Sequence, residues 1–367
     1  MTDPTEAERG RLLAEAKRYL AGPEYSVTFL RCPRSGGTEH DYYSEGPYWW
    51  PNPDDPDGPH IRRDGFVNPD AFLAHLNAMH DLAAAVGGLA VAYELTAERR
   101  WLEKVERLLA TWFLDERTAM APHLEYGQAI HGVCRGRGIG IIDTSGLIEL
   151  TLAVEQLKDR LSAGLVSGLR EWFGRYNRWL LTSDHGRSEK EQPNNHSILW
   201  LAQAAAFSRF SGQTDRLPEC RQLYREIIIP QQVEPDGRMP RELARTRPFS
   251  YAILGLNGLA ANCLLLSGPG EDLFRFETDD GRGLVRVLDY LLPYLSGSQV
   301  WPYPRPEGIV DTPPPPAALL LAGRALGRED WLALWDRLQD DPPPIYGRQR
   351  PGLFANPRLW ERRPPVD

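Results

Sequence analysis

From residue 70 onward, apolar residues recur at spacings of three and four positions, the periodicity of helices that bury one face. Strand-like alternation of apolar and polar residues is scarce. Glycine and proline fall between the periodic segments, where they end one helix before the next begins. The pattern predicts about ten helices, at residues 70–96, 99–115, 144–160, 162–182, 196–211, 216–229, 249–266, 283–296, 314–326 and 328–339.

A succession of helices of similar length favours an all-α fold of stacked helical hairpins. A solenoid and a closed α/α toroid both fit this pattern. The α/α toroid is favoured because long polar loops recur between the helices, and such loops usually line one rim. No segment has the composition of a flexible linker, so we predict a single domain over residues 1–367.

Three of these loops combine aromatic and polar residues, at 41–65, 123–144 and 232–251. Tyrosine and tryptophan beside proline and glycine predict rigid surfaces there. The first loop contains GPYWWPNPD, which places Tyr48, Trp49 and Trp50 together. Such aromatics either pack in the core or stack on the faces of sugar rings, and the sequence alone favours neither use.

Composition and charge restrict the function. The chain is 42% hydrophobic and 25% charged, as in ordinary globular proteins. A net charge of −8 without a basic block argues against a nucleic-acid partner. An anionic ligand would therefore need a local cluster of positive groups. The four cysteines are scattered and no His/Asp cluster has ligand spacing, so we predict free thiols, no metal and no cofactor.

The first twenty residues are acidic and then amphipathic, without the apolar core of a signal peptide. The most apolar segment, 249–266, carries Asn257 and Asn262 and falls short of a clean membrane span. The sequence as given thus predicts a cytoplasmic protein with no membrane partner. The alternative is a secreted or periplasmic protein whose leader has been removed.

The stretch QPNNHSILW starts an apolar helix after the polar run SDHGRSEKEQP, which has no apolar face to bury. Asn194 or Asn195 as N-cap would accept a backbone N–H of the first turn. His196 lies in that turn, where the helix dipole disfavours a protonated imidazole. A neutral imidazole is what a general base requires, although most histidines in such positions are structural.

The third loop ends in RELARTRPFSY, where Arg241, Arg245 and Arg247 precede Tyr251. The simplest interpretation is a solvated basic patch followed by a core tyrosine. The alternative is a site for an anionic sugar, because arginine neutralises carboxylates and a phenol exchanges protons.

The second loop contains GQAIHGVCRGRGIGIIDT. Its glycines do not follow the spacing of a dinucleotide-binding loop, and no strand–helix unit surrounds them. Gln128, His131 and Arg135 are candidates for lining a polar cleft.

Together, these motifs resemble the alginate-lyase superfamily of polysaccharide lyases, in order from about residue 41 to 260. The resemblance implies an α/α toroid and β-elimination at a 4-linked uronic acid. A base removes the C5 proton, a neutralising group holds the carboxylate, and an acid protonates the departing O4, which leaves a C4=C5 double bond. The implied partner is an anionic uronate polysaccharide or oligosaccharide, such as alginate or glucuronan.

The same resemblance implies roles for individual residues. Asn195 would neutralise the substrate carboxylate, while Asn194 caps the helix at the edge of the binding site. His196 would be the base or a carboxylate partner, depending on the sugar epimer. Tyr251 would protonate the leaving oxygen and, for syn elimination, also act as base. Arg245 would hold the carboxylate or lower the pKa of Tyr251, with Arg241 as the alternative arginine.

Two other functions compete with the lyase. A toroid glycoside hydrolase would need paired carboxylates that flank the bond. The sequence offers four candidates but nothing that marks a pair, namely Asp143, Glu189, Glu234 and Asp236. The third possibility is a non-catalytic protein that binds acidic glycans through the same aromatic cleft.

Overall fold

The computed structural model describes residues 4–340 and 353–361 and is mostly helical. Its α-helices are α1 (Glu6–Ala21), α2 (Ala74–Thr96), α3 (Arg99–Phe113), α4 (Leu147–Leu157), α5 (Ala163–Thr182), α6 (Asp184–Lys190), α7 (Asn195–Ser211), α8 (Leu217–Leu223), α9 (Ile229–Gln232), α10 (Pro240–Leu243), α11 (Pro248–Leu266), α12 (Leu284–Leu295), α13 (Ala318–Leu326) and α14 (Glu329–Asp340). Its strands are β1 (Tyr43–Glu45), β2 (Trp49–Trp50), β3 (Ile61–Arg62) and β4 (Tyr126–Ala129).

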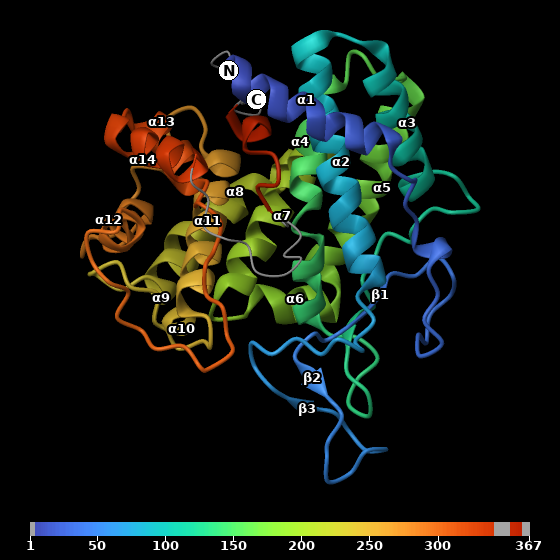
Figure 1. Cartoon of the computed structure of the whole chain (residues 1–367), viewed down its shortest axis with the longest axis horizontal. Helices are drawn as coiled ribbons and strands as arrows, with labels where there is room; N and C mark the ends of the chain where they lie inside the picture. Colours follow the sequence, from blue (N-terminus) through green and yellow to red (C-terminus); the bar gives the residue numbers. More distant parts are fainter. Residues whose placement is uncertain (1–3, 341–352, 362–367) are drawn as a thin grey trace.

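The helices form two layers that curve around the molecule (Figure 1). In the inner layer α2, α4, α7, α11 and α13 contact one another in this order. The outer layer holds α3, α5, α8, α12 and α14, each packed on an inner helix or on its outer neighbour. Alternation of inner and outer helices in chain order is the arrangement of an α/α toroid, so the predicted fold class is confirmed.

The C-terminal segment connects the two ends of the inner layer. The short helix η5 (Pro357–Glu361) packs on α2 and α4, and Glu361 forms an ion pair with Arg324 of α13 at 2.8 Å. Arg358 forms a second ion pair, with Glu8 of α1 at 2.7 Å. Packing on α2 and α4, together with these two ion pairs, therefore fastens η5 to four helices.

A buried carboxyl group on α4 also holds this segment. Glu149 is fully buried and accepts hydrogen bonds from the backbone N–H of Asn356 at 3.0 Å and from Nε1 of Trp360 at 2.7 Å. Burial raises the pKa of Glu149 from its ordinary value near 4.5 to about 7, although both donors oppose that rise. The folded protein therefore binds this proton more tightly than the unfolded chain does.

Glu149 should make folding stability depend on pH. Since its pKa is raised in the folded state, its contribution is complete below about pH 4.5 and is lost as pH rises towards 7. The difference in unfolding free energy between wild type and Glu149→Gln should fall by about 3 kcal/mol across that interval. Urea denaturation of both proteins at a series of pH values measures this difference. A constant difference would show that Glu149 does not titrate in this interval.

Most predicted helices are confirmed within a few residues, but the prediction for 216–229 needs correction. That segment is divided into α8, a π-helical turn at Tyr224–Ile228, and α9. The sequence pattern also missed α1, α6 and α10. The helix α6 lies in the polar run before Asn194 that has no apolar face. It forms because Oγ of Ser183 accepts the N–H of Gly186, and because it buries Gly186 and Glu189 rather than apolar side chains.

The aromatic loops gather at the end of the toroid that appears at the lower edge of Figure 1. There β1 of the first loop pairs in parallel with β4 of the second, and β2 pairs with β3 within the first loop. The third loop contains α10 and leads into α11. The helix α11 is long and apolar enough to cross a membrane, but most of it is buried inside the protein, between α7 and α13. Core packing therefore explains its apolar composition.

Candidate active site

The first turn of α7 holds His196 against a buried carboxylate. Oδ1 of Asn194 accepts the backbone N–H of His196 at 3.2 Å, which confirms Asn194 as the N-cap. Nδ1 of His196 lies 2.6 Å from Oε1 of Glu189, whose side chain is only 1% exposed, whereas that of His196 is 12% exposed. Burial raises the pKa of Glu189, and the neighbouring His196 opposes the rise. When Glu189 is ionised, Nδ1 carries the proton and Nε2 is left as the acceptor.

Asn195 is fully buried and bound to a carboxylate of the protein. Its backbone N–H and its side-chain Nδ2 donate to the two carboxylate oxygens of Glu242, at 2.6 and 2.7 Å. This pair fixes the start of α7 to α10. The role of Asn195 in neutralising the substrate carboxylate stays a prediction.

Tyr251, in the first turns of α11, is surrounded by polar groups from two loops. Its hydroxyl accepts a hydrogen bond from Arg245 at 2.7 Å and lies 3.0 Å from the hydroxyl of Tyr48. The guanidinium group of Arg245 also lies over the Tyr251 ring, 3.7 Å from its centroid. Tyr48 and Arg245 thus approach the phenol from different loops, as the predicted site requires.

The charge of Arg245 is already matched by Asp64. Nε and Nη2 of Arg245 donate to both carboxylate oxygens, at 3.2 and 2.9 Å, and Thr246 adds a third hydrogen bond. Although burial opposes ionisation of Asp64, the hydrogen bonds and charge of Arg245 hold its pKa at about 2. Arg245 is therefore half of an ion pair that joins the first loop to the third.

Tyr251 keeps its proton more firmly than the sequence suggested. Burial raises the pKa of the phenol well above its ordinary value of 10, and the charge of Arg245 reverses only part of this effect. Arg245 therefore lowers the pKa of Tyr251, as predicted, but burial outweighs this effect and the pKa stays above its ordinary value. A phenol that is protonated at neutral pH is suited to donating a proton.

Arg137, in the second loop, lies near Trp49 of the first loop. The guanidinium carbon lies 5.7 Å from the centroid of the Trp49 ring. Nε and Nη2 of Arg137 donate to the backbone oxygen and to Oε1 of Gln128, at 3.1 and 3.0 Å. Nε2 of Gln128 in turn donates to the buried Asp143 at 3.0 Å. Gln128 thus joins Arg137 to Asp143, and its contact with substrate stays a prediction.

Gly138 brings this part of the loop close to α6. A β-carbon at Gly138 would lie 2.6 Å from the backbone oxygen of His185 and 3.2 Å from the nitrogen of Glu189. A larger residue at this position would therefore collide with α6. The neighbouring Arg137 is close enough for its charge to oppose the rise in the pKa of Glu189.

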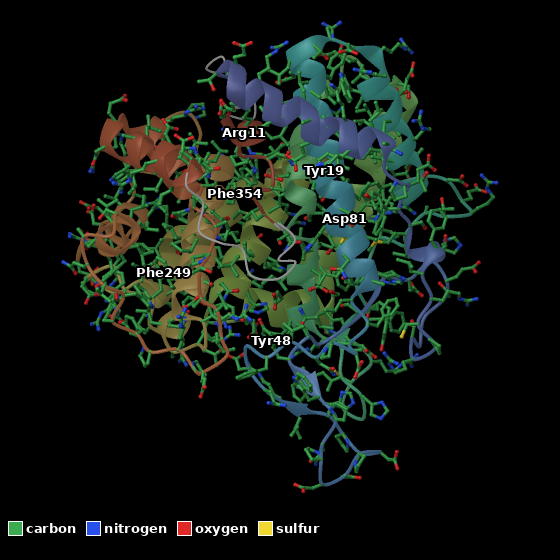
Figure 2. All side chains as sticks on the ribbon, in the orientation of Figure 1. Arg11, Tyr19, Tyr48, Asp81, Phe249 and Phe354 are labelled. Carbon is green, nitrogen blue, oxygen red and sulfur yellow. The ribbon has the colours of Figure 1, made fainter. Side chains whose placement is uncertain are left out.

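These contacts form a closed circuit, which we call the active-site circuit. Its members, in order, are Arg137, Trp49, Tyr48, Tyr251, Arg245, Glu242, Asn195, His196, Glu189 and Gly138. Each member touches the next or is joined to it by one or a few residues of backbone. The four residues predicted to be catalytic all belong to it, although they come from two separate parts of the sequence. Figure 2 places Tyr48 at the loop end of the toroid, below the helices.

The other predicted binding residues lie outside the circuit. His131 is exposed, with its ring 5.1 Å from that of His60, and both line a hollow of about 220 Å³ together with Trp49. Arg135 lines a neighbouring hollow of about 360 Å³ and donates to the backbone oxygen of Gly36. His131 and Trp49 therefore share a surface depression beside the circuit, and Arg135 lies farther along the same face.

Three further predictions concern loop residues near the circuit. Trp50 donates through Nε1 to the backbone oxygen of Phe66, and Arg63 lies over its ring, so its face is already covered. Arg247 donates to the backbone oxygen of Gly65 at 3.0 Å, whereas Arg241 is exposed on α10. Arg245, not Arg241, is therefore the arginine in contact with Tyr251.

Three of the four proposed hydrolase carboxylates are bound by other side chains, and one of them, Glu189, is the partner of His196. Asp143 is buried under hydrogen bonds from Tyr42, Ser44 and Gln128. Asp236 is bound by Arg238 in an exposed turn. Within residues 4–340 and 353–361, no group of three or more His, Cys, Asp or Glu side chains is placed to hold a metal ion.

Comparison with known proteins identifies the family. The family model described as alginate lyase matches residues 31–301, most of the chain. The chain belongs to the alginate lyase family. It is a polysaccharide lyase, as the sequence motifs predicted, and the hydrolase and binding-protein alternatives are set aside.

Solved alginate lyases share the fold of this lyase. An alginate lyase from Bacteroides ovatus is 31% identical, with a TM-score of 0.82 over 90% of this chain and 88% of that one. Alginate lyase A1-III from Sphingomonas species A1 is 15% identical, with a TM-score of 0.54 over 97% and 92% of the two chains. A variant of the A1-III enzyme complexed with a tetrasaccharide gives the same TM-score at 14% identity, over 95% and 91%. No curated protein matches the chain significantly.

Four residues of this lyase site escaped the sequence analysis or were given another role there. Asp64, Glu189 and Glu242 each bind a residue that was predicted to be catalytic, and Arg137 lies two positions from the predicted Arg135. All four lie in polar or mixed segments that have no periodic pattern. A charged residue in such a segment is usually solvated, so only the folded structure distinguishes these four from their neighbours.

Proposed function

We propose that this lyase cleaves 4-linked uronate chains of the alginate type by β-elimination. Family membership and the fold shared with the Bacteroides ovatus alginate lyase support an anionic polysaccharide or oligosaccharide as substrate. The observation that carries the proposal is the active-site circuit. It brings an imidazole, a phenol and guanidinium groups to one end of the toroid, beside a hollow lined by Trp49 and His131.

His196 is the general base in this proposal. The Nδ1–H group of His196 donates a hydrogen bond to ionised Glu189. Nε2 is then unprotonated and can take the C5 proton of the uronate. The imidazolium ion that forms is then stabilised by the carboxylate of Glu189 at 2.6 Å. Glu189 is a positioning residue, because it acts through the histidine.

Tyr251 is the general acid. Burial keeps its phenol protonated, and Arg245 and Tyr48 hold its oxygen by hydrogen bonds. The electron pair left at C5 forms the C4=C5 double bond as the C4–O4 bond breaks. The departing O4 takes the phenolic proton of Tyr251, and Arg245 stabilises the phenolate that remains.

A substrate screen tests the proposal. We expect incubation with polymannuronate, polyguluronate or glucuronan to produce the ultraviolet absorbance of an unsaturated uronide, together with new reducing ends. The absorbance arises from the C4=C5 bond, which hydrolysis does not create. Reducing ends without this absorbance would contradict elimination, and absence of both signals with all three polymers would contradict the substrate class.

A further inference from the structure

We infer that Arg137 is the residue that binds and neutralises the carboxylate of the uronate from which the C5 proton is removed. This inference rests on the proposed function and adds a substrate-binding residue to the same site. Elimination requires such a group, because the C5 proton becomes acidic only when charge that develops on the carboxylate is stabilised.

The other arginines near Tyr251 are already engaged or lie elsewhere. Arg245 forms a two-point ion pair with Asp64, so a substrate carboxylate would have to compete with a carboxylate already in place. Arg247 donates to the backbone of Gly65, and among the described residues its guanidinium group makes no hydrogen bond to a member of the active-site circuit; Arg241 is exposed on α10. Asn195 directs its amide at Glu242. Arg245 and Asn195 are thus each already bonded to a carboxylate of the protein.

Arg137 has the properties that the role requires. Across the described parts of the chain, residues 4–340 and 353–361, no carboxylate lies within ion-pair distance of its guanidinium group. Its two hydrogen bonds go to uncharged oxygens of Gln128. Burial lowers the pKa of Arg137, because water is partly removed from around its charge, while the more distant charges of Asp143 and Glu189 oppose this effect. An incoming carboxylate would supply a direct counter-ion through a charge-assisted hydrogen bond.

The residues behind Arg137 hold it in a fixed position. Gln128 adopts a left-handed backbone conformation, with φ at 49°, which is unusual for a residue other than glycine. Its backbone N–H donates to Ser44 at 2.8 Å, and its side chain joins Asp143 to Arg137. Asp143 also accepts hydrogen bonds from Ser44 and Tyr42. This buried network directs a cation without neutralising it at close range.

The position of Arg137 in the active-site circuit also fits. Gly138 packs on the backbone of Glu189, which binds His196, and the guanidinium carbon of Arg137 lies 5.7 Å from the centroid of the Trp49 ring. Arg137 is therefore next in sequence to a residue that contacts the partner of the proposed base, and it lies near an aromatic residue of the hollow. A sugar that stacks on Trp49 would present its carboxylate to the guanidinium group and its C5 proton to the imidazole.

The test compares Arg137→Gln with wild type on polymannuronate and on its methyl ester. On the free acid, kcat/KM of the variant should fall roughly 10²- to 10³-fold. On the ester the loss should be clearly smaller, because the ester carries no anion before the reaction and only the charge that develops on its carbonyl oxygen remains to be stabilised. Arg221→Gln is the matched control, because Arg221 also donates to a backbone oxygen, that of Leu266, away from the circuit. Its kcat/KM should stay at the wild-type value on both substrates.

An equal loss on acid and ester would overturn the inference, since Arg137 would then not act on the carboxylate charge. Unchanged activity on the acid would overturn it as well. If the wild type forms no unsaturated product, the result contradicts the proposed function. It does so before any comparison with the Arg137→Gln variant is made.

A binding measurement keeps the inference testable without turnover. In a His196→Ala background, calorimetry with a mannuronate tetrasaccharide should show a dissociation constant at least tenfold higher after Arg137→Gln. The methyl ester should bind the two proteins equally. Equal affinity of the two proteins for the acid, or failure of the tetrasaccharide to bind the parent, would overturn the inference.

Discussion

Replacing Tyr251 by phenylalanine is expected to lower kcat on a uronate polymer by roughly 10²- to 10⁴-fold, the usual contribution of a general acid. The variant retains the aromatic ring under Arg245 and removes only the hydroxyl, to which Arg245 and Tyr48 bind. The leaving O4 would then depart as an alkoxide. The initial rate of ultraviolet absorbance measures the loss, and thermal unfolding tests whether the fold is retained.

The chain provides a control for this variant. Tyr290 and Tyr303 form a second hydroxyl pair, at 3.3 Å, on the outer helix α12 and the loop that follows it. Arg238 lies beside Tyr303, as Arg245 lies beside Tyr251. Tyr303→Phe should therefore cost a similar hydrogen bond and leave kcat unchanged. If Tyr251→Phe lowers stability but not kcat, Tyr251 has a structural role and another group protonates the leaving oxygen.

The fold could be predicted because burial leaves a periodic record in the sequence. The helix α11 is apolar on nearly every side because it lies between α7 and α13, and its bounds agree with the prediction within one residue. By contrast, α6 buries a glycine and a glutamate, which no hydrophobic pattern can detect. The same helix supplies the carboxylate that binds His196, so the missed helix and the missed site residue have one cause.

The site could be predicted in part. His196 and Tyr251 lie in motifs, and the structure places both in one circuit of contacts. Their partners depend on contacts between distant segments, such as Arg245 with Asp64, 181 residues apart. From the sequence, Arg245 is expected to hold the substrate carboxylate or to lower the pKa of Tyr251, because the pattern does not reveal that Asp64 binds its guanidinium group. Charge balance in a site is a property of the folded chain.

The ion pair between Asp64 and Arg245 also indicates why the first loop is rigid. It fastens residues 41–65 to the start of α11, and the hydroxyl contact between Tyr48 and Tyr251 adds a second attachment. Both Tyr48 and Trp49 are thereby fixed relative to the proposed acid and to Arg137. Substrate-binding aromatics that are held in place lose little conformational freedom when a sugar binds.

Substitutions of His196 and of Glu189 are expected to have different effects on kcat, because His196 is the proposed base and Glu189 only positions it. His196→Ala should lower kcat by roughly 10²- to 10⁴-fold at every pH, because no other group replaces Nε2. Glu189→Gln should lower kcat by less, since Oε1 of glutamine can still accept a hydrogen bond from Nδ1–H of His196. In that variant the imidazolium ion loses its anionic partner, so the acidic limb of the pH profile of kcat should move to lower pH.

The controls for this pair are His185→Ala and Glu125→Gln. His185 also lies on α6, and its Nε2 is 3.7 Å from Oε2 of Glu125, but both side chains are more exposed than the His196–Glu189 pair. Neither control should alter kcat or its pH profile. A Glu189→Gln variant with reduced kcat and an unshifted acidic limb would mean that Glu189 supports the fold of the first turn of α7 without acting on the proton. The imidazole would then work without an anionic partner, and the case for His196 as base would rest on His196→Ala alone.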